Sequence, residues 1–430
     1  MNTQLKKGVT LTVIPTEKFK TVRVLIRFST MLEEETVTKR TLLSSLLETN
    51  SKNYPVQTDI SEKLAEMYGT SFNIYVGRKG NHHWLSLAMN FVNDKYLNDE
   101  NENVLDEAIR FIEEILFSPN IQGGKFHEET FQREKENLKQ YMDSVKEDKQ
   151  YYASLALNKL FFRDSAVQGM PSFGKSEYLE KETSQSLASY YRQVLTQDDV
   201  DILVIGDVEE KEIAEKFSKL PFVDRLAPLG NIFYTPTENN VINQRVEREH
   251  LAQSKLNLAY RLPIRYDSPR YFALQVFNGL FGGFAHSKLF MNIREKESMA
   301  YYASSSFDSF RGLLTVQTGI DAKNEKRVLH MIHEELENIR LGNITKDEME
   351  QTKAMLKNSY LLGLDNANSL IEKQFIEELI PKSSYSQEEW MKLIDFVTKE
   401  QVMKIAEEVE LQAIFFLEGT EEESGERADD

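Results

Sequence analysis

The chain has 430 residues, of which 40% are hydrophobic and 28% are charged, an ordinary globular composition that suffices for two or three domains with real cores. It contains no cysteine, which excludes structural disulfides, thiolate catalysis and zinc sites built on cysteine. Its formal net charge is −17, with 69 acidic against 52 basic residues, so nucleic acid, a polyanion, is not an expected partner.

The two ends of the chain are polar. Segment 1–7 lacks the apolar core and the small-residue cleavage site of a signal peptide. No apolar run along the chain approaches the length of a membrane span, so we expect no membrane insertion and a cytoplasmic location. The acidic tail 420–430 has almost no apolar residues and is expected to be disordered.

The first half of the chain, 1–226, reads as strands at its ends with helices between them. Apolar residues alternate with polar ones in the expected strands and recur at helical spacing in the expected helices. The strands are predicted at 10–15, 21–28, 71–76, 82–91 and 200–208, and the helical segments at 41–50, 60–68, 104–117 and 126–162.

The second half, 251–419, repeats this order after a linker at 227–250, which contains two prolines, a glycine and a polar run. Its strands are predicted at 255–262, 301–307, 312–319 and 412–419, and its helices at 271–280, 289–294, 326–341 and 346–362. The pattern indicates an α+β protein of two homologous halves. We expect each half to be a mixed or antiparallel sheet with helices packed on one face.

The most informative segment is 279–301. A glycine-rich turn is followed by a short helix, a charged Arg-Glu-Lys-Glu run, and a Met-Ala-Tyr sequence that leads into a strand. Glycines allow a close backbone approach because they carry no Cβ. Leu289 and Ile293 are four residues apart and can bury one helix face, while Arg294 begins the exposed run.

This order of features resembles the second half of the insulinase/pitrilysin-like metallopeptidases, the inverzincin family that includes the mitochondrial processing peptidase. The resemblance extends over most of the chain and implies that Arg294 and Tyr301 bind substrate peptide near the scissile carbonyl. An Arg fork and a Tyr hydroxyl can hold such a carbonyl and stabilise its oxyanion. From the residues alone, the alternative is a solvated arginine and a packing tyrosine. The sequence departs from the family at 297–299, where a Gly-Leu pair is frequent.

The resemblance also shows what the chain lacks. Active members carry His-x-x-Glu-His on a first-half helix, with two zinc-binding histidines, a Glu as general base, and a third ligand, a Glu, on a later helix. Aligned on Glu48, this chain has Ser45 and Thr49 in place of the histidines, and Tyr141 or Gln140 in place of the distal Glu. Hydroxyls are poor zinc ligands at neutral pH. The resemblance therefore implies a degenerate motif, with no catalytic residue and no metal in this chain.

The other histidines give no metal site from their spacing. His330 and His333 lie three apart on a predicted helix, off its buried stripe, which favours an exposed polar pair over a site that needs further ligands. His82 and His83 are adjacent on a strand and point to opposite faces. His286, in the glycine-rich turn, either faces a substrate or has no catalytic role. No nucleophile elbow, phosphate-binding loop or dinucleotide fingerprint is present.

These features favour a non-catalytic subunit of a heterodimeric zinc metallopeptidase. A similar-sized partner would carry the zinc and its motif, and this chain would add chamber wall and the Arg294/Tyr301 pair for the peptide substrate. The alternatives are a peptide- or protein-binding module without any peptidase role, and an active hydrolase with an unrecognised site.

Overall fold

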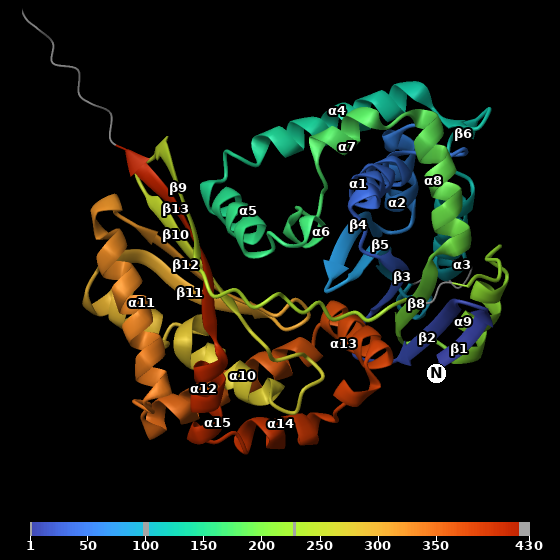
Figure 1. Cartoon of the computed structure of the whole chain (residues 1–430). Coiled ribbons are helices and arrows are strands. Elements are labelled where there is room, and N and C mark those ends of the chain that lie inside the picture. The colour runs from blue at the N-terminus through green and yellow to red at the C-terminus, as the bar shows by residue number, and fades with distance from the viewer. Residues whose placement is uncertain (1, 98–102, 227–228, 421–430) are drawn as a thin grey trace, which may run out of the picture. The chain divides into compact units, whose positions relative to one another are not determined.

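The computed structural model describes residues 2–97, 103–226 and 229–420 (Figure 1). The described residues form two compact units. Unit 1 lies within Met1–Ser144, Pro171–Ile232 and Gly363–Pro381, and unit 2 within Val145–Met170, Phe233–Leu362 and Lys382–Asp430. Each unit therefore includes a piece of chain from the other half of the sequence. Most of the expected acidic tail, 421–430, and residues 227–228 of the expected linker lie outside the described residues.

Unit 1 is built on a six-stranded sheet in the order β1-β2-β8-β3-β5-β4. Its neighbouring strands are antiparallel, except that β2 and β8 run parallel. The strands are β1 Asn2–Lys6, β2 Val9–Pro15, β3 Thr21–Met31, β4 Ser71–Lys79, β5 His82–Val92 and β8 Asp199–Gly206.

Helices of unit 1 cover one face of this sheet. Alternate residues of β3, such as Val24 and Ile26, share a buried core with Leu42, Phe111 and Leu187 from three helices. The other elements of this part of unit 1 are α1 Glu34–Thr49, α2 Gln57–Glu66, η1 Asp94–Tyr96, α3 Val104–Phe117, the hairpin β6 Ile121–Gln122 with β7 Lys125–Phe126, α4 Glu128–Ser144, α7 Ser176–Lys181, α8 Ser184–Gln197 and α9 Glu210–Ser218. Helix α13 Ala367–Leu379 also belongs to unit 1 but lies on the opposite face of the sheet.

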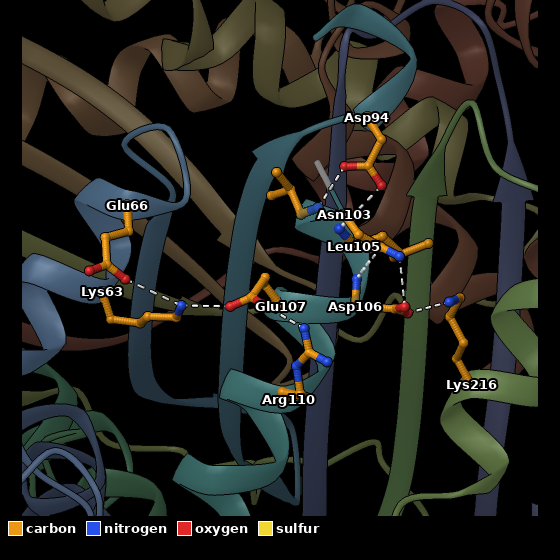
Figure 2. A network of polar contacts seen from close by, with 10 residues as sticks. Lys63, Glu66, Asp94, Asn103, Leu105, Asp106, Glu107, Arg110 and Lys216 are labelled. Carbon is orange, nitrogen blue, oxygen red and sulfur yellow. Dashed lines mark hydrogen bonds and ion pairs between the residues drawn. The ribbon is translucent and has the colours of Figure 1, made fainter. Parts of the chain in front are cut away.

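A polar network holds the first turn of α3 (Figure 2). Asp94 accepts a hydrogen bond from the Val104 amide at 2.7 Å. Glu107 is bonded by Lys63 of α2 at 2.6 Å, and the neighbouring Asp106 by Lys216 of α9. These bonds join α2 and α9 to the N-terminus of α3. The negative carboxylates in this first turn also interact favourably with the helix dipole.

Unit 2 is built on a five-stranded sheet in the order β11-β12-β10-β13-β9, again with one parallel pair, β13 and β9. Its strands are β9 Asn243–His250, β10 Ser254–Arg261, β11 Ala300–Asp308, β12 Leu313–Ile320 and β13 Glu410–Thr420. Its helical elements are α5 Lys149–Phe161, α6 Ala166–Gly169, α10 Tyr271–Asn278, η2 Gly279–Gly283, η3 Leu289–Lys296, η4 Ala322–Asn324, α11 Glu325–Arg340, most of α12 Lys346–Leu364, most of η5 Pro381–Ser383, α14 Gln387–Asp395 and α15 Lys399–Glu408.

The two sheets have one topology. Numbered along the chain from β2 in unit 1 and from β9 in unit 2, both sheets have the strand order 1-5-2-4-3, and in both the pair 1–5 is parallel. The α+β class, the mixed sheets and the two homologous halves expected from the sequence are confirmed. The second face of each sheet carries a helix from the other half of the chain, α13 in unit 1 and α5 in unit 2.

Three local predictions are wrong. The helical region expected at 126–162 is two helices, because Asp148 caps a new helix by accepting a hydrogen bond from the Tyr151 amide at 2.9 Å. The glycine-rich turn is the π-helical segment η2, which continues α10. The stretch 227–250, expected to be only a linker, contains β9. Across the described ranges, no helix is both long and apolar enough to cross a membrane.

Candidate functional site

Helix α1 of unit 1 carries the positions where the family resemblance places the histidines. The Ser45 hydroxyl donates to the Thr41 carbonyl at 3.4 Å, and the Thr49 hydroxyl donates to the Leu46 carbonyl at 3.3 Å. Short hydroxyl side chains commonly bond back to the preceding helical turn in this way. Both hydroxyls thus have partners within their own helix.

Glu48 lies on the same helix and is half-buried. Burial raises the pKa of the Glu48 carboxyl; a hydrogen bond with the Ile74 backbone of β4 lowers it, and the negative charge of Glu134 on α4 raises it further. Glu134 is itself buried and accepts hydrogen bonds from Arg133 at 2.8 Å and Asn137 at 3.2 Å.

The distal position differs from what a metal would need. Tyr141, seven residues after Glu134 on α4, is half exposed, and its ring packs edge-on against Phe173 at 5.3 Å. Sequence reasoning missed Glu134, although a spacing of seven residues places it on the same helix face, two turns before Tyr141. The buried carboxylate next to Glu48 therefore comes from Glu134.

This donor set does not fit a zinc ion. Zinc in a protease needs three protein ligands of imidazole, thiolate or carboxylate type around an open position. Here two hydroxyls bond to helix carbonyls and the phenol of Tyr141 packs on a ring. In the described part of the chain, no group of three or more His, Asp or Glu side chains is arranged to hold a metal.

The counterpart of α1 in unit 2, between the second and third strands of its sheet, is the segment α10–η2–η3. Both η2 and η3 are π-helical, a conformation often found at functional sites. Gly282 allows β11 to approach, because a Cβ on this residue would lie 2.5 Å from the Ser305 backbone nitrogen.

Arg294 and Tyr301 lie on adjacent elements, η3 and β11, and are both exposed. The Arg294 guanidinium stacks over the Phe290 ring at 4.6 Å. The Tyr301 hydroxyl donates to Asp321 at 3.1 Å, and this bond is the first cause of a raised Tyr301 pKa. The structure thus gives each side chain its own partner. Sequence reasoning missed Asp321, which follows β12, far from Tyr301 in the chain.

The turn between these two residues shows why the family favours glycine there. Ser298 has φ +53°, in the left-handed region that costs a residue with a Cβ about 1 kcal/mol or more. The departure seen at 297–299 in the sequence therefore leaves the turn geometry available, at the cost of backbone strain.

His286 lines a cavity of about 770 Å³ together with Lys288, Lys296, Glu348 and Met355. Its Nε2 bonds the Thr352 hydroxyl at 2.8 Å, and partial burial lowers its pKa. The cavity lining drawn from the described residues includes neither Arg294 nor Tyr301. His286 therefore lies on a neighbouring surface of the same segment.

The other histidines considered from the sequence differ in their surroundings. His330 is exposed and lies 3.0 Å from Glu334, one turn along α11. The His82 ring bonds the Gly230 carbonyl at 2.8 Å. His83 is fully buried, and neither of its ring nitrogens has a hydrogen-bond partner among the described residues. Its burial lowers its pKa strongly, with Arg40 and Arg78 adding to the effect.

Comparison with known proteins agrees with this geometry. Residues 181–356 match the family described as Peptidase M16 inactive domain. The chain is 34% identical over 420 residues to the "probable inactive metalloprotease YmfF" of Bacillus subtilis, with 96% of each chain covered. It is 25% identical over 315 residues to the "uncharacterized zinc protease YmxG" of the same species, covering 71% of this chain and 74% of that one.

A solved structure is closer still. The crystal structure of a conserved protein from Enterococcus faecalis V583 superposes with a TM-score of 0.93 at 59% identity, covering 98% of both chains. The matched length, the identity to an inactive relative and the degenerate donor set lead to one conclusion: the chain belongs to the M16 peptidase family, the insulinase/pitrilysin-like metallopeptidases, as a member of its inactive type.

Proposed function

We propose that this protein is the non-catalytic subunit of a heterodimeric, cytoplasmic zinc metallopeptidase, in which a similar-sized partner carries the zinc motif. The observation that carries the proposal is an asymmetry. The metal position on α1 has lost its ligands, whereas Arg294 and Tyr301 remain exposed on η3 and β11. A chain that had lost every peptidase role would have no reason to keep a strained turn between them.

In this proposal the chain binds the peptide and the partner cleaves it. Tyr301 is the second residue of β11, the terminal strand of its sheet, and no other strand of the described chain pairs with the outer side of β11. An extended peptide can add to such an edge through main-chain hydrogen bonds. The fork of Arg294 and the hydroxyl of Tyr301 would then hold a peptide carbonyl at the partner's metal.

The proposed partner has support among the relatives. Bacillus subtilis has both a relative named as an inactive metalloprotease and a relative named as a zinc protease, each similar to this chain over most of its length. Two chains of one family in one organism, one described as inactive, are what a divided peptidase requires.

The direct test is reconstitution with a zinc-motif chain of the same family from the same organism. Peptide cleavage is measured for the pair with wild-type chain, with Arg294→Ala plus Tyr301→Phe, and with Arg248→Ala. Arg248 is an exposed arginine on β9, the strand at the other edge of the same sheet, and serves as the control. We expect the double variant to lower kcat/KM about 100-fold, the loss seen when carbonyl-binding donors are removed. Unchanged cleavage would remove the assigned role of the pair.

Two further measurements separate the alternatives. Zinc analysis of the purified chain is expected to find less than stoichiometric metal, and the triple variant Ser45→His, Thr49→His, Tyr141→Glu is expected to bind about one equivalent. Titration of the isolated chain with peptides is expected to show weak binding. Tight binding without a partner would instead favour a peptide-binding module, and stoichiometric zinc with proteolysis by the lone chain would favour an active hydrolase.

A further inference from the structure

Unit 2 contains a second cavity, of about 630 Å³, between α11 and the sheet. Its volume is within the range of about 300–1,000 Å³ typical of small-molecule sites. The lining from α11 recurs at steps of three and four residues, which is one helix face. The apolar part of the lining consists of Ile242, Leu258, Tyr260, Leu329, Leu336, Val409, Leu411 and Ile414.

A β-bulge shapes the floor of this cavity. Ala413 pairs with Ala259, but the next paired residue on β13 is Leu411, opposite Tyr260. Gln412 is the extra residue, and its side chain donates to the Asn239 carbonyl at 3.0 Å and accepts from the Asn239 amide at 3.1 Å. The bulge brings Leu411 beside Tyr260 on the cavity floor. Bulges are over-represented next to binding sites because they re-aim side chains in this way.

The polar end of the cavity is held rigidly. The Arg340 guanidinium donates to the carbonyls of Ala406 at 2.8 Å and Val409 at 2.7 Å, and it also bonds Glu337. Three of its five N–H groups are thereby used, which fixes the fork and leaves two donors. The Val409 carbonyl that accepts from Arg340 lies two residues before Leu411, the strand partner of Tyr260, so the two groups belong to one end of the cavity.

Tyr260 is a donor without an acceptor. It is only 3% exposed, it lines the cavity, and its hydroxyl has no hydrogen bond to another described residue. Burial raises the pKa of this phenol, so it stays protonated. The hydroxyl opens onto the cavity, where it can donate a hydrogen bond to a bound acceptor.

The charges of the lining favour an anion. The chain has a net charge of −17, yet this helix face brings Lys326 and Arg340 to the cavity. Lys326 makes no ion pair within the described chain, and the one acidic side chain of the lining, Glu410, is tied to Arg261 at 3.2 Å. A long apolar floor with a cationic, hydrogen-bond-donating end fits a molecule with an alkyl chain and an acid group.

We propose that this cavity binds a linear aliphatic carboxylate. The carboxylate accepts hydrogen bonds from Arg340 and Tyr260, and the alkyl chain extends over Leu411, Ile414 and Leu258 toward Leu329. Lys326 lies at the far end of the helix face, about 21 Å from Arg340 at 1.5 Å per residue, where its charge attracts the anion to the cavity. The inference concerns a site that the proposed peptidase role does not use.

The test is calorimetric titration of the full chain with dodecanoate, and with dodecyltrimethylammonium as the probe of opposite charge. We expect saturable one-to-one binding of dodecanoate and none of the cation. Tyr260→Phe removes only a hydroxyl and is expected to weaken dodecanoate binding about 5- to 10-fold. Leu411→Trp fills the cavity and is expected to abolish binding, while Arg327→Ala, outside the cavity lining, leaves binding unchanged.

Folding of each variant is checked by its thermal unfolding. Should Leu411→Trp fail to fold, Ile242→Trp blocks the cavity instead, since Ile242 lines it and is half exposed. Equal binding of the cationic probe, or dodecanoate affinity unaffected by Tyr260→Phe and by the blocking variant, overturns the proposal. So does binding of an acidic amphipathic peptide by a chain that ignores dodecanoate, which would make the cavity a protein-docking surface.

Discussion

Helices α5 and α13 occupy equivalent places in the two halves of the chain, and each joins the unit built on the other half's sheet. Each helix packs on the sheet face opposite to the main helical layer of its unit. Both helices bury apolar side chains, but only the contact of α13 includes a buried arginine. The two equivalent helix-to-sheet contacts, called joints below, should therefore differ in their sensitivity to salt and pH.

Helix α5 attaches to unit 2 mainly through apolar packing. Ala153, Leu157 and Phe161 are buried against a layer that includes Ala413 and Phe415 of β13. Polar contacts around this layer are neutral or peripheral, such as the 2.9 Å bond from Gln317 to Ser154. Burial of this kind depends little on salt and pH.

Helix α13 also buries apolar side chains, Ile371, Phe375 and Ile376, but its contact with unit 1 includes a buried charge as well. Arg27 of β3 is 1% exposed, and its guanidinium lies 4.4 Å from the ring centres of both Trp84 and Phe375. It forms an ion pair with Glu372 of α13, and Glu378 of the same helix accepts from Thr12 at 2.7 Å. Because the Arg27 cation is nearly buried, the stability of this contact should depend on its ion-pair partner, Glu372, and on the charge of the neighbouring carboxyl groups.

The chain's own tryptophans can report on the two joints separately. It contains two, Trp84 in unit 1 beside Phe375, and Trp390 in unit 2, stacked on Tyr360 at 4.1 Å. In a Trp390→Phe variant, the fluorescence of Trp84 reports the unfolding of unit 1 and the contact with α13. In a Trp84→Phe variant, the fluorescence of Trp390 reports the unfolding of unit 2.

The largest expected effect is at Arg27. Arg27→Leu removes the cation between two rings and leaves Glu372 without its partner, so we expect a loss of about 3 kcal/mol in the free energy of unfolding of unit 1. Denaturant titration in the Trp390→Phe background measures it. The difference from wild type should shrink in 1 M salt. A loss below about 1 kcal/mol would mean that charge is not what holds α13.

Leu157→Ala is the matching change in α5. Leu157 is 1% exposed, and its truncation should cost unit 2 about 2.5 kcal/mol through lost burial and the cavity left behind. Titration in the Trp84→Phe background measures this loss. It should be the same at low salt and at 1 M salt, and a strong salt dependence would contradict the contrast between the two helices.

The sequence predicted the duplicated plan because apolar periodicity is strong in the central strands. β3, β8, β10 and β13 are central strands of their sheets and largely buried, and all four were found. β9 was missed because it is an edge strand whose sequence, Asn243–His250, is almost wholly polar. Its role as the first strand of unit 2 follows from pairing with β13, which no local pattern reveals.

The candidate site was predictable in part. Ser45, Glu48 and Thr49 are consecutive motif positions on one helix, so the loss of ligands could be read from the sequence. Glu134 could not be paired with Glu48, because that pairing depends on how α4 packs on α1. The sequence also did not predict that α5 and α13 each pack on the sheet formed by the other half of the chain. Both helices bury apolar residues, and such a pattern does not indicate which sheet covers them.

A smaller effect is expected at Asp201, which faces the α13 joint. The pKa of the Asp201 carboxyl is raised to about 7, mainly by burial and then by the negative charges of Asp199 and Glu378, while Arg27 opposes the increase. Because the folded pKa exceeds the unfolded value of 3.8, the native state holds an extra proton between about pH 4 and pH 7. Stability of unit 1 from this group therefore falls as pH rises through that window.

Asp201→Asn should remove this dependence. We expect the variant to be more stable than wild type by roughly 1–2 kcal/mol at pH 8, after allowance for solvent screening, and to show no gain at pH 4. Unfolding titrations across this range, with Trp84 as the reporter, measure the difference. A gain that is largest at pH 4 would reverse the sign and contradict the raised pKa.

The smallest effect is expected where α5 does carry a charge pair. Lys149, at the start of α5, forms an ion pair with Glu249 of β9 at 2.5 Å, and each side chain is about one-third exposed. Exposed pairs contribute little, so Lys149→Ala should cost unit 2 no more than about 0.5 kcal/mol. Lys219→Ala, which breaks the more exposed pair with Glu215 in unit 1, gives the baseline. If Lys149→Ala lowered the free energy of unfolding as much as Arg27→Leu does, charge would contribute equally to the attachment of α5. The proposed difference between the two helices would then be wrong.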